Sequence, residues 1–294
     1  MKFKKSHVNR ALTSAGIKTF MSLKSSSFVN EEKELTFYGG IILNSEGKYE
    51  IIQNPNSKNK VAEVFYNRVI NQKGWNKLSV KTHNLANAYE QAFLAGYLEG
   101  RMSSEDIFYF FNNLATNNQN HKRKRFAHLL KFFDEVAQNI NIRIINSING
   151  FDSFTPEGKE YWSRIILGYA QLEGLMKGYD YEIERRGEKE EKEISLSEFL
   201  LIQADGEINE LMTAIKAEKL LKSNRVKIGD KNYFDLAFGI KTNDPVKFWK
   251  ELMRSSRCSA FIKILKDEEN NWKDLIAGHS TWADYSELLR TYKQ

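Results

Sequence analysis

Residues 258–265 have the sequence Cys-Ser-Ala-Phe-Ile-Lys-Ile-Leu, in which alternate positions form two sets, as in a β-strand. The polar residues 266–271 follow, and residues 272–279, Trp-Lys-Asp-Leu-Ile-Ala-Gly-His, are a second strand candidate. The pattern predicts an antiparallel hairpin. Counting outward from the turn on both strands places Cys258 opposite His279 at the open end.

A cysteine opposite a histidine is a candidate catalytic pair, because the thiolate is the nucleophilic form and a neighbouring base or charge produces it. The alternative interpretation is a buried small apolar residue beside an unrelated histidine. Cys258 is the only cysteine among 294 residues, which excludes an intrachain disulfide framework and a cysteine-rich zinc site. We expect no cofactor and no metal.

Upstream of this hairpin, the sequence predicts short strands first and then helices. Residues 34–53 indicate a hairpin around the turn residues 44–47, and residues 62–69 and 78–82 are further strand candidates. From Leu85 onward, apolar residues recur at three- and four-residue spacing, which is typical of helices. The pattern predicts an α+β protein.

The helix boundaries have local signals of their own. Ser103 and Asp106 resemble a capping box, and Thr155-Pro156 is typical of a helix start. A later helix is expected from Ser195 or Ser197 through Leu220, and a short closing helix over residues 283–293.

The charge balance is modest, with 44 basic and 38 acidic residues giving a net charge of +6. The densest basic run, Lys122–Arg125, could contact phosphates of nucleic acid or lipid head groups, or it could be the solvated first turn of a long helix. No zinc finger or aromatic RNA-binding signature accompanies it, so no nucleic-acid partner is expected. Residues 182–193 contain both acidic and basic side chains, a pattern that predicts an exposed loop or helix end.

Several blocks of the sequence, spread over roughly residues 35–294, resemble the phospholipase B-like family. The blocks near the carboxyl end are residues 258–263, 274–285 (Asp-Leu-Ile-Ala-Gly-His-Ser-Thr-Trp-Ala-Asp-Tyr) and 288–293. The blocks upstream are Gly74-Trp75, residues 95–100 (Ala-Gly-Tyr-Leu-Glu-Gly), residues 172–175 (Leu-Glu-Gly-Leu) with Gly178-Tyr179, and Gln203 with residues 205–208 (Asp-Gly-Glu-Ile).

The resemblance implies an N-terminal-nucleophile hydrolase, folded as an αββα sandwich that is incomplete in this chain and preceded by a largely helical portion. Members of the family cut their own chain before a cysteine, which here falls between Arg257 and Cys258. The freed Cys258 would be the nucleophile, and its new α-amino group the general base. His279 and Trp282 match residues that the family places in the active site, His279 to polarise the substrate or orient the nucleophile and Trp282 to shape the pocket.

The same resemblance implies three segments: residues 1–33, poorly ordered; residues 34–257, strand hairpins plus a helical pro-region; and residues 258–294, the start of the nucleophile-bearing sheet. Members are about twice as long as this chain, so a C-terminal truncation is expected. The expected function is hydrolysis of acyl ester or amide bonds of lipids or acyl-amide substrates. The alternative is an inactive family member that acts as a binding module.

The family implies a lysosomal or secreted location. We find in this chain no signal peptide, no Asn-x-Ser/Thr acceptor and no apolar run of transmembrane length. The only contact with a membrane that we expect is a peripheral one, at the membrane surface. The oligomeric state does not follow from the sequence.

Overall fold

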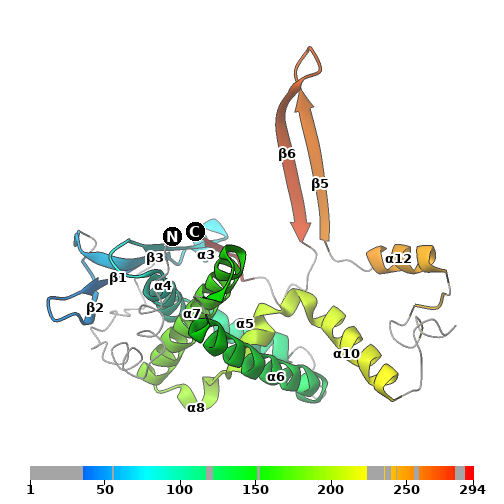
Figure 1. The fold of residues 1–294 in the computed structure, drawn as a ribbon. Helices are drawn as coiled ribbons and strands as arrows, with labels where there is room; N and C mark the ends of the chain where they lie inside the picture. Colours follow the sequence, from blue (N-terminus) through cyan, green and yellow to red (C-terminus); the bar gives the residue numbers. More distant parts are fainter. Residues whose placement is uncertain are drawn as a thin grey trace. The chain divides into compact units, whose positions relative to one another are not determined.

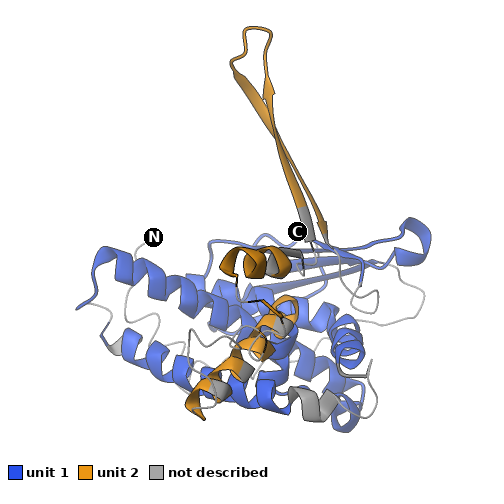
Figure 2. Ribbon diagram, turned by 90° about the vertical axis from the view of Figure 1, so that its right-hand side faces the viewer, with its two compact units in different colours: residues 1–202, 289–294 blue, residues 203–288 orange. Residues whose placement is uncertain are grey.

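The computed structural model describes residues 36–294 except 55, 117–121, 151–152, 224–234, 236–239, 243, 255–257 and 282–288. The expected N-terminal segment, residues 1–33, lies outside these residues. Two compact units are present, one of residues 1–202 with 289–294 and one of residues 203–288 (Figure 2). The first unit contains a sheet and helices, and the second contains helices and a separate hairpin, so the expected α+β class is confirmed.

The sheet of the first unit has five strands in the order β2-β1-β3-β4-β7. The first four are antiparallel neighbours, and β7 pairs parallel to β4. The strands are β1 (Thr36–Leu43), β2 (Tyr49–Ile52), β3 (Lys60–Asn67), β4 (Asn76–Thr82) and β7 (Thr291–Lys293). The hairpin around residues 44–47 and the two further strands predicted from the sequence are confirmed.

Strand β7 contradicts the expected closing helix over residues 283–293. Residues 291–293 are extended, because their backbone groups complete the edge of β4: Asn76 N–H donates to the Arg290 carbonyl (2.9 Å) and Gln294 N–H to the Leu78 carbonyl (2.9 Å). A short amphipathic pattern does not distinguish a helix from an edge strand when the partner strand lies more than 200 residues away. Residues 282–288 of that prediction lie outside the described residues.

The first unit contains α3 (Ile70–Lys73), α4 (Ala88–Met102), α5 (Ser104–Thr116), α6 (Lys122–Asn149), α7 (Pro156–Arg185), α8 (Lys189–Lys192) and α9 (Leu196–Gln203). The second contains η2 (Asp205–Glu207), α10 (Ile208–Lys222) and α12 (Pro245–Arg254). Helix α7 begins as predicted, with Thr155 as N-cap and Pro156 in the first turn. The single helix expected up to Leu220 is divided by the 3-10 turn at Asp205–Glu207.

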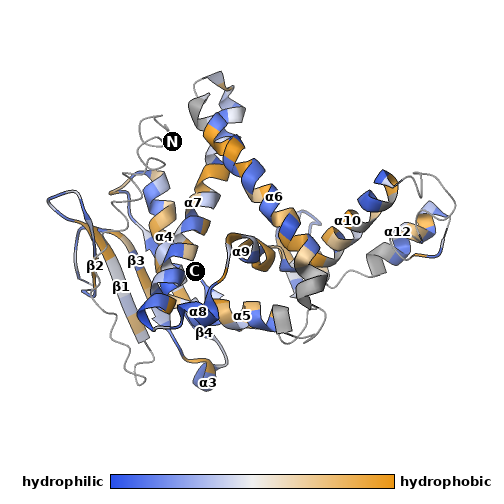
Figure 3. Ribbon diagram, turned by 90° about the horizontal axis from the view of Figure 1, so that it is seen from below, coloured by the Kyte–Doolittle hydropathy of each residue, from blue (hydrophilic) through white to orange (hydrophobic). Residues whose placement is uncertain are grey.

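Helix α4 packs on the sheet, and α7 packs on α4 (Figure 1). Apolar side chains of α4, among them Phe93 and Leu98, join residues of β1, β3 and β4 in one buried cluster. Helix α6 shows the helical spacing predicted for the chain after Leu85, since Leu129, Phe133 and Ala137 are buried four residues apart in a helix with alternating polar and apolar colours (Figure 3).

The glycine motifs of α4 and α7 meet each other at the crossing of these two helices. A Cβ at Gly96 would stand 1.9 Å from the Gln171 carbonyl oxygen, and one at Gly174 would stand 2.0 Å from the Phe93 carbonyl oxygen. Only glycine lets the two backbones approach this closely. Two blocks of the family resemblance, residues 95–100 and 172–175, therefore position the two central helices.

The capping box expected from Ser103 and Asp106 is not formed. Ser103 ends α4, and its backbone N–H donates to the Glu99 carbonyl (2.8 Å). The Asp106 carboxylate instead accepts a hydrogen bond from the Tyr66 hydroxyl (2.9 Å), joining α5 to β3. A tertiary partner of the carboxylate overrides the local capping pattern.

Candidate active site

The hairpin of β5 (Cys258–Lys266) and β6 (Trp272–Thr281) has the two strands that the sequence predicts. Asp267 holds its turn, because its backbone N–H donates to the Asn271 carbonyl (3.0 Å) and its carboxylate accepts from the Asn271 N–H (2.7 Å). Asn270 adopts a left-handed conformation with φ of 67°, which asparagine tolerates better than most residues. The register shifts between Leu265 and Lys266: Leu265 pairs with Asp274 and Lys266 pairs with Trp272, so one residue of β6 between them has no partner on β5.

This register differs from the pairing that we predicted by counting residues outward from the turn. Cys258 pairs with Thr281, and His279 pairs with Ala260. Cys258 and His279 are therefore diagonal rather than direct neighbours, with Cα atoms expected roughly 7–8 Å apart. The direct opposition predicted from the sequence is wrong by two residues, because Lys266 already pairs with Trp272 and the register shifts by one further residue before Leu265 pairs with Asp274.

The structure describes the three candidate residues to different extents. Cys258 is the first residue of β5, and its backbone position alone is described. His279 is an exposed residue of β6. Trp282 lies outside the described residues. The catalytic roles of the three residues stay predictions.

The hairpin is apolar on both faces, and its apolar side chains are exposed. Ile262 is 72% exposed and Trp272 is 71% exposed. The Phe261 ring lies against Gly278, where a Cβ would stand 2.2 Å from the ring. Glycine at 278 therefore lets the aromatic ring lie over the backbone next to His279.

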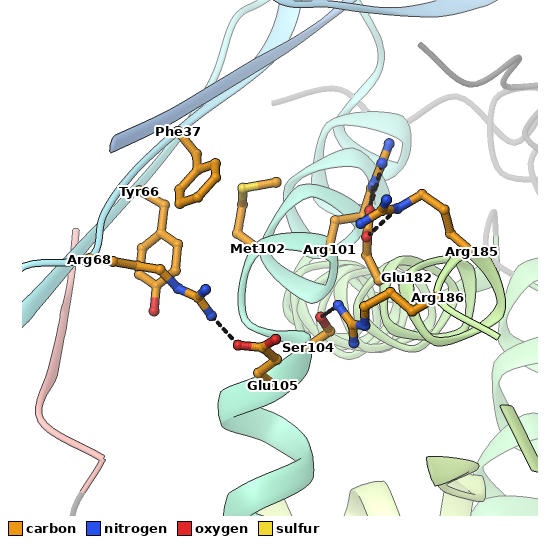
Figure 4. A pocket seen from close by; sticks show the side chains of 10 residues that line it. All are labelled: Phe37, Tyr66, Arg68, Arg101, Met102, Ser104, Glu105, Glu182, Arg185 and Arg186. Atoms are coloured by element: carbon orange, nitrogen blue, oxygen red, sulfur yellow. Dashed lines mark hydrogen bonds and ion pairs between the residues drawn. The ribbon is translucent and has the colours of Figure 1, made fainter. Parts of the chain in front are cut away.

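The first unit contains a pocket that the sequence analysis did not predict. Four arginines and two glutamates line it, next to an apolar wall (Figure 4). Residues 182–193 were expected to be exposed, but Glu182 is 3% exposed, because it accepts hydrogen bonds from Arg101 (2.7 Å) and Arg185 (2.9 Å). The signal available in the sequence is three- to four-residue spacing, which continues the buried face of α7 through Gly178 to Glu182.

Within the described part of the chain, no group of three or more His, Cys, Asp and Glu side chains could hold a metal ion. Within the same part, every helix is too short or too polar to span a bilayer. The basic run Lys122–Arg125 forms the first turn of α6. Its side chains lie outside the described residues, so the solvated turn and the phosphate contact both stay predictions.

Comparison with known proteins matches residues 62–294 of this chain to the family model described as Phospholipase B. Phospholipase B-like protein C of Dictyostelium discoideum is 27% identical over 253 residues, which cover 86% of this chain and 38% of that protein. Phospholipase B-like protein D of the same organism is 25% identical over 267 residues, which cover 90% of this chain and 40% of that protein.

This chain therefore spans about two fifths of the length of the curated relatives that it matches. The family model covers most of the chain, including α4, α7 and the hairpin of β5 and β6. The chain belongs to the phospholipase B family.

Proposed function

We propose that this chain carries the nucleophile of a hydrolase that cleaves acyl ester or amide bonds of lipids, with Cys258 as the attacking residue. The observation that carries the proposal is the position of Cys258 at the first residue of β5, within the part of the chain that matches the family. A cut directly before a strand would leave a new amino terminus held by the hydrogen bonds of that strand.

The chemistry requires two steps at the same sulfur. In processing, the Cys258 thiol attacks the Arg257 carbonyl, the peptide nitrogen takes a proton, and water hydrolyses the thioester to leave a carboxylate and a free α-amine. In turnover, that amine accepts the thiol proton, the sulfur attacks the substrate acyl carbon, and the protonated alcohol or amine departs. Water then releases the acyl group as a carboxylic acid.

His279 lies on the partner strand at the same end of the hairpin, two residues from the position directly opposite Cys258. An imidazole there could donate a hydrogen bond to the developing oxyanion of the substrate. The indole of Trp282, which can only donate, is assigned to the wall of the acyl pocket.

Intact-mass measurement of the purified chain tests processing. The proposal expects a fragment of residues 258–294 in the wild type, and none in Cys258→Ala. Ser259→Ala, at the neighbouring position, is the matched control and is expected to be cut. An uncut wild-type chain that still releases fatty acid from phospholipid would contradict the scheme.

Acyl release from a fluorogenic phospholipid tests the nucleophile separately. Cys258→Ala is expected to abolish release, whereas His279→Ala is expected to lower kcat with KM less affected. Full activity in Cys258→Ala would remove the residue from the mechanism.

A second candidate function, an inactive binding module, is favoured by one observation, the exposure of apolar side chains on both faces of the hairpin. Flotation of the chain with liposomes distinguishes it. Binding that is equal in wild type and Cys258→Ala, without processing or acyl release in the wild type, would support the binding module.

A further inference from the structure

The pocket of the first unit lies where the ends of five elements meet. Phe37 of β1 and Tyr66 of β3 form one side with Arg68, which follows β3. The last turn of α4, the first turn of α5 and the last turn of α7 complete it (Figure 4). Its volume is about 410 Å³, including the opening to solvent.

The pocket lining carries more positive than negative charge. Arg68, Arg101, Arg185 and Arg186 face Glu105 and Glu182, and Glu188 pairs with Arg186 from outside the lining, so four cations less three anions leave +1. Glu105 pairs with Arg68, and Glu182 is shared by Arg101 and Arg185. Because one carboxylate serves two guanidinium groups, positive charge remains at the α7 side of the pocket.

Arg186 provides a donor that the protein leaves unused. Its Nε donates to Glu188 (2.7 Å), and its Nη1 donates to the Ser104 hydroxyl (3.1 Å). Its Nη2 is buried and has no hydrogen-bond partner among the described residues. A buried N–H group without an acceptor is costly, so such a group in a folded protein calls for an explanation, and a bound ion is one of those that apply.

Ser104 is the first residue of α5, so the amino end of a 13-residue helix lies beside the same guanidinium. A helix amino terminus attracts negative charge through its exposed N–H groups and dipole. Guanidinium forks match the oxygens of phosphate groups, and a tetrahedral oxyanion can accept from several forks at once.

We propose that this pocket binds a phosphate-class oxyanion, either free phosphate or the phosphate of an organic ester, through Arg185 and Arg186. Phe37 and Met102 supply an apolar wall on which the organic part of an ester would lie. The site lies in the first unit, and the proposal does not depend on the Cys258 chemistry.

Titration calorimetry of the whole chain with sodium phosphate, at constant ionic strength set by chloride, tests the proposal. The wild type is expected to bind phosphate saturably, and Arg186→Gln to bind about tenfold or more weakly, the loss of one charge-assisted contact. Arg164→Gln is the matched control on the same helix: its side chain is 78% exposed and pairs with Glu160, so binding is expected to be unchanged.

Far-UV circular dichroism establishes that each variant is folded. If Arg186→Gln is not, Arg185→Gln takes its place, since Glu182 keeps its pair with the buried Arg101 in that variant. Equal phosphate binding by wild type and a folded Arg185→Gln or Arg186→Gln variant would overturn the proposal. The proposal would also be overturned if titrating the wild type with sodium chloride gave the same heat signal as titrating it with sodium phosphate.

A second titration, with glycerol 3-phosphate, distinguishes the sources of the oxyanion. Binding of both compounds with the same dependence on Arg186 assigns the pocket to organic phosphates such as lipid head groups. Binding of inorganic phosphate alone assigns it to the free ion. Binding of neither would overturn the site.

Discussion

Gly100 of α4 packs directly against the main chain of Leu175 in α7, where a Cβ at position 100 would stand 2.0 Å from the Leu175 carbonyl oxygen. The same contact recurs along the crossing at Gly96, Gly174 and Gly178, each with a Cβ position 1.9 to 2.1 Å from a carbonyl oxygen of the other helix. Since the obstacle is backbone rather than a movable side chain, the two helices cannot adjust to a substitution without separating.

Gly100→Ala is therefore expected to destabilise the protein by about 3 kcal/mol or more, at the upper end of the range for overpacked cores. Gly168→Ala, in the same helix as Gly174, is the control. Apart from the backbone of its own helix, no atom of the described residues lies within 4 Å of a Cβ at 168, so alanine is expected to stabilise the helix by about 0.5–1 kcal/mol. Urea denaturation measures the free energy of unfolding of both variants. Equal changes in the two would contradict the close contact between Gly100 and the main chain of α7.

Glu182→Gln is expected to cost about 3–5 kcal/mol, because it leaves the guanidinium of Arg101 buried without its counter-ion. The Arg101 side chain is 0% exposed and that of Glu182 is 4% exposed. Glu160→Gln breaks an exposed pair with Arg164 on the same helix and is expected to cost less than about 1 kcal/mol. The comparison is made in urea, and a small effect of Glu182→Gln would show that the pair is dispensable.

Burial raises the pKa of Asp106 above its ordinary value of 3.8, and the hydrogen bond from Tyr66 opposes this effect. The folded state therefore retains the proton to higher pH than the unfolded chain. The stability contributed by the neutral carboxyl is fully present below pH 3.8 and is lost as the pH rises through the pKa of the folded state.

Asp106→Asn removes this titration, so the stability of the variant relative to wild type is expected to rise as the pH increases from about 3.8. Thermal unfolding of both proteins across this range measures the difference. Asp134→Asn, at an exposed position of α6, is the control and is expected to show a much smaller change. A constant difference between Asp106→Asn and wild type would refute the assignment.

If the chain is cut before Cys258, the fragment of residues 258–294 is expected to stay bound without a covalent link. Strand β7 lies within it, and Val80 N–H donates to the Gln294 carbonyl (2.9 Å) while Gln294 N–H donates to the Leu78 carbonyl (2.9 Å). Native mass spectrometry is expected to show both pieces together, and denaturing conditions to separate them.

Gln294→Pro removes the N–H that Leu78 accepts and is expected to weaken retention of the fragment. Gln294→Ala keeps that N–H and is the matched control. Dissociation of the wild-type fragment in native buffer would contradict a structural role for β7.

Most elements could be predicted from local pattern alone. The first hairpin, the strands after it, the start of α7 at Thr155 and the hairpin of β5 and β6 all follow from turn residues, caps and periodicity. Three of the predictions that failed involve a distant partner: β7 pairs with β4, Asp106 binds Tyr66, and Glu182 binds Arg101. Their partners lie 40 or more residues away, beyond any local pattern.

The candidate site divides in the same way. The residue types, the family motifs and the position of Cys258 at a strand start follow from the sequence itself, because turn chemistry and alternation act over a few residues. The register that sets Cys258 diagonal to His279 depends on where the turn begins and on the extra residue of β6 between Trp272 and Asp274. The clustering of four arginines in one pocket depends on the close approach of α4 to α7. The glycines of both helices permit this approach, but only the tertiary structure brings the two helices together.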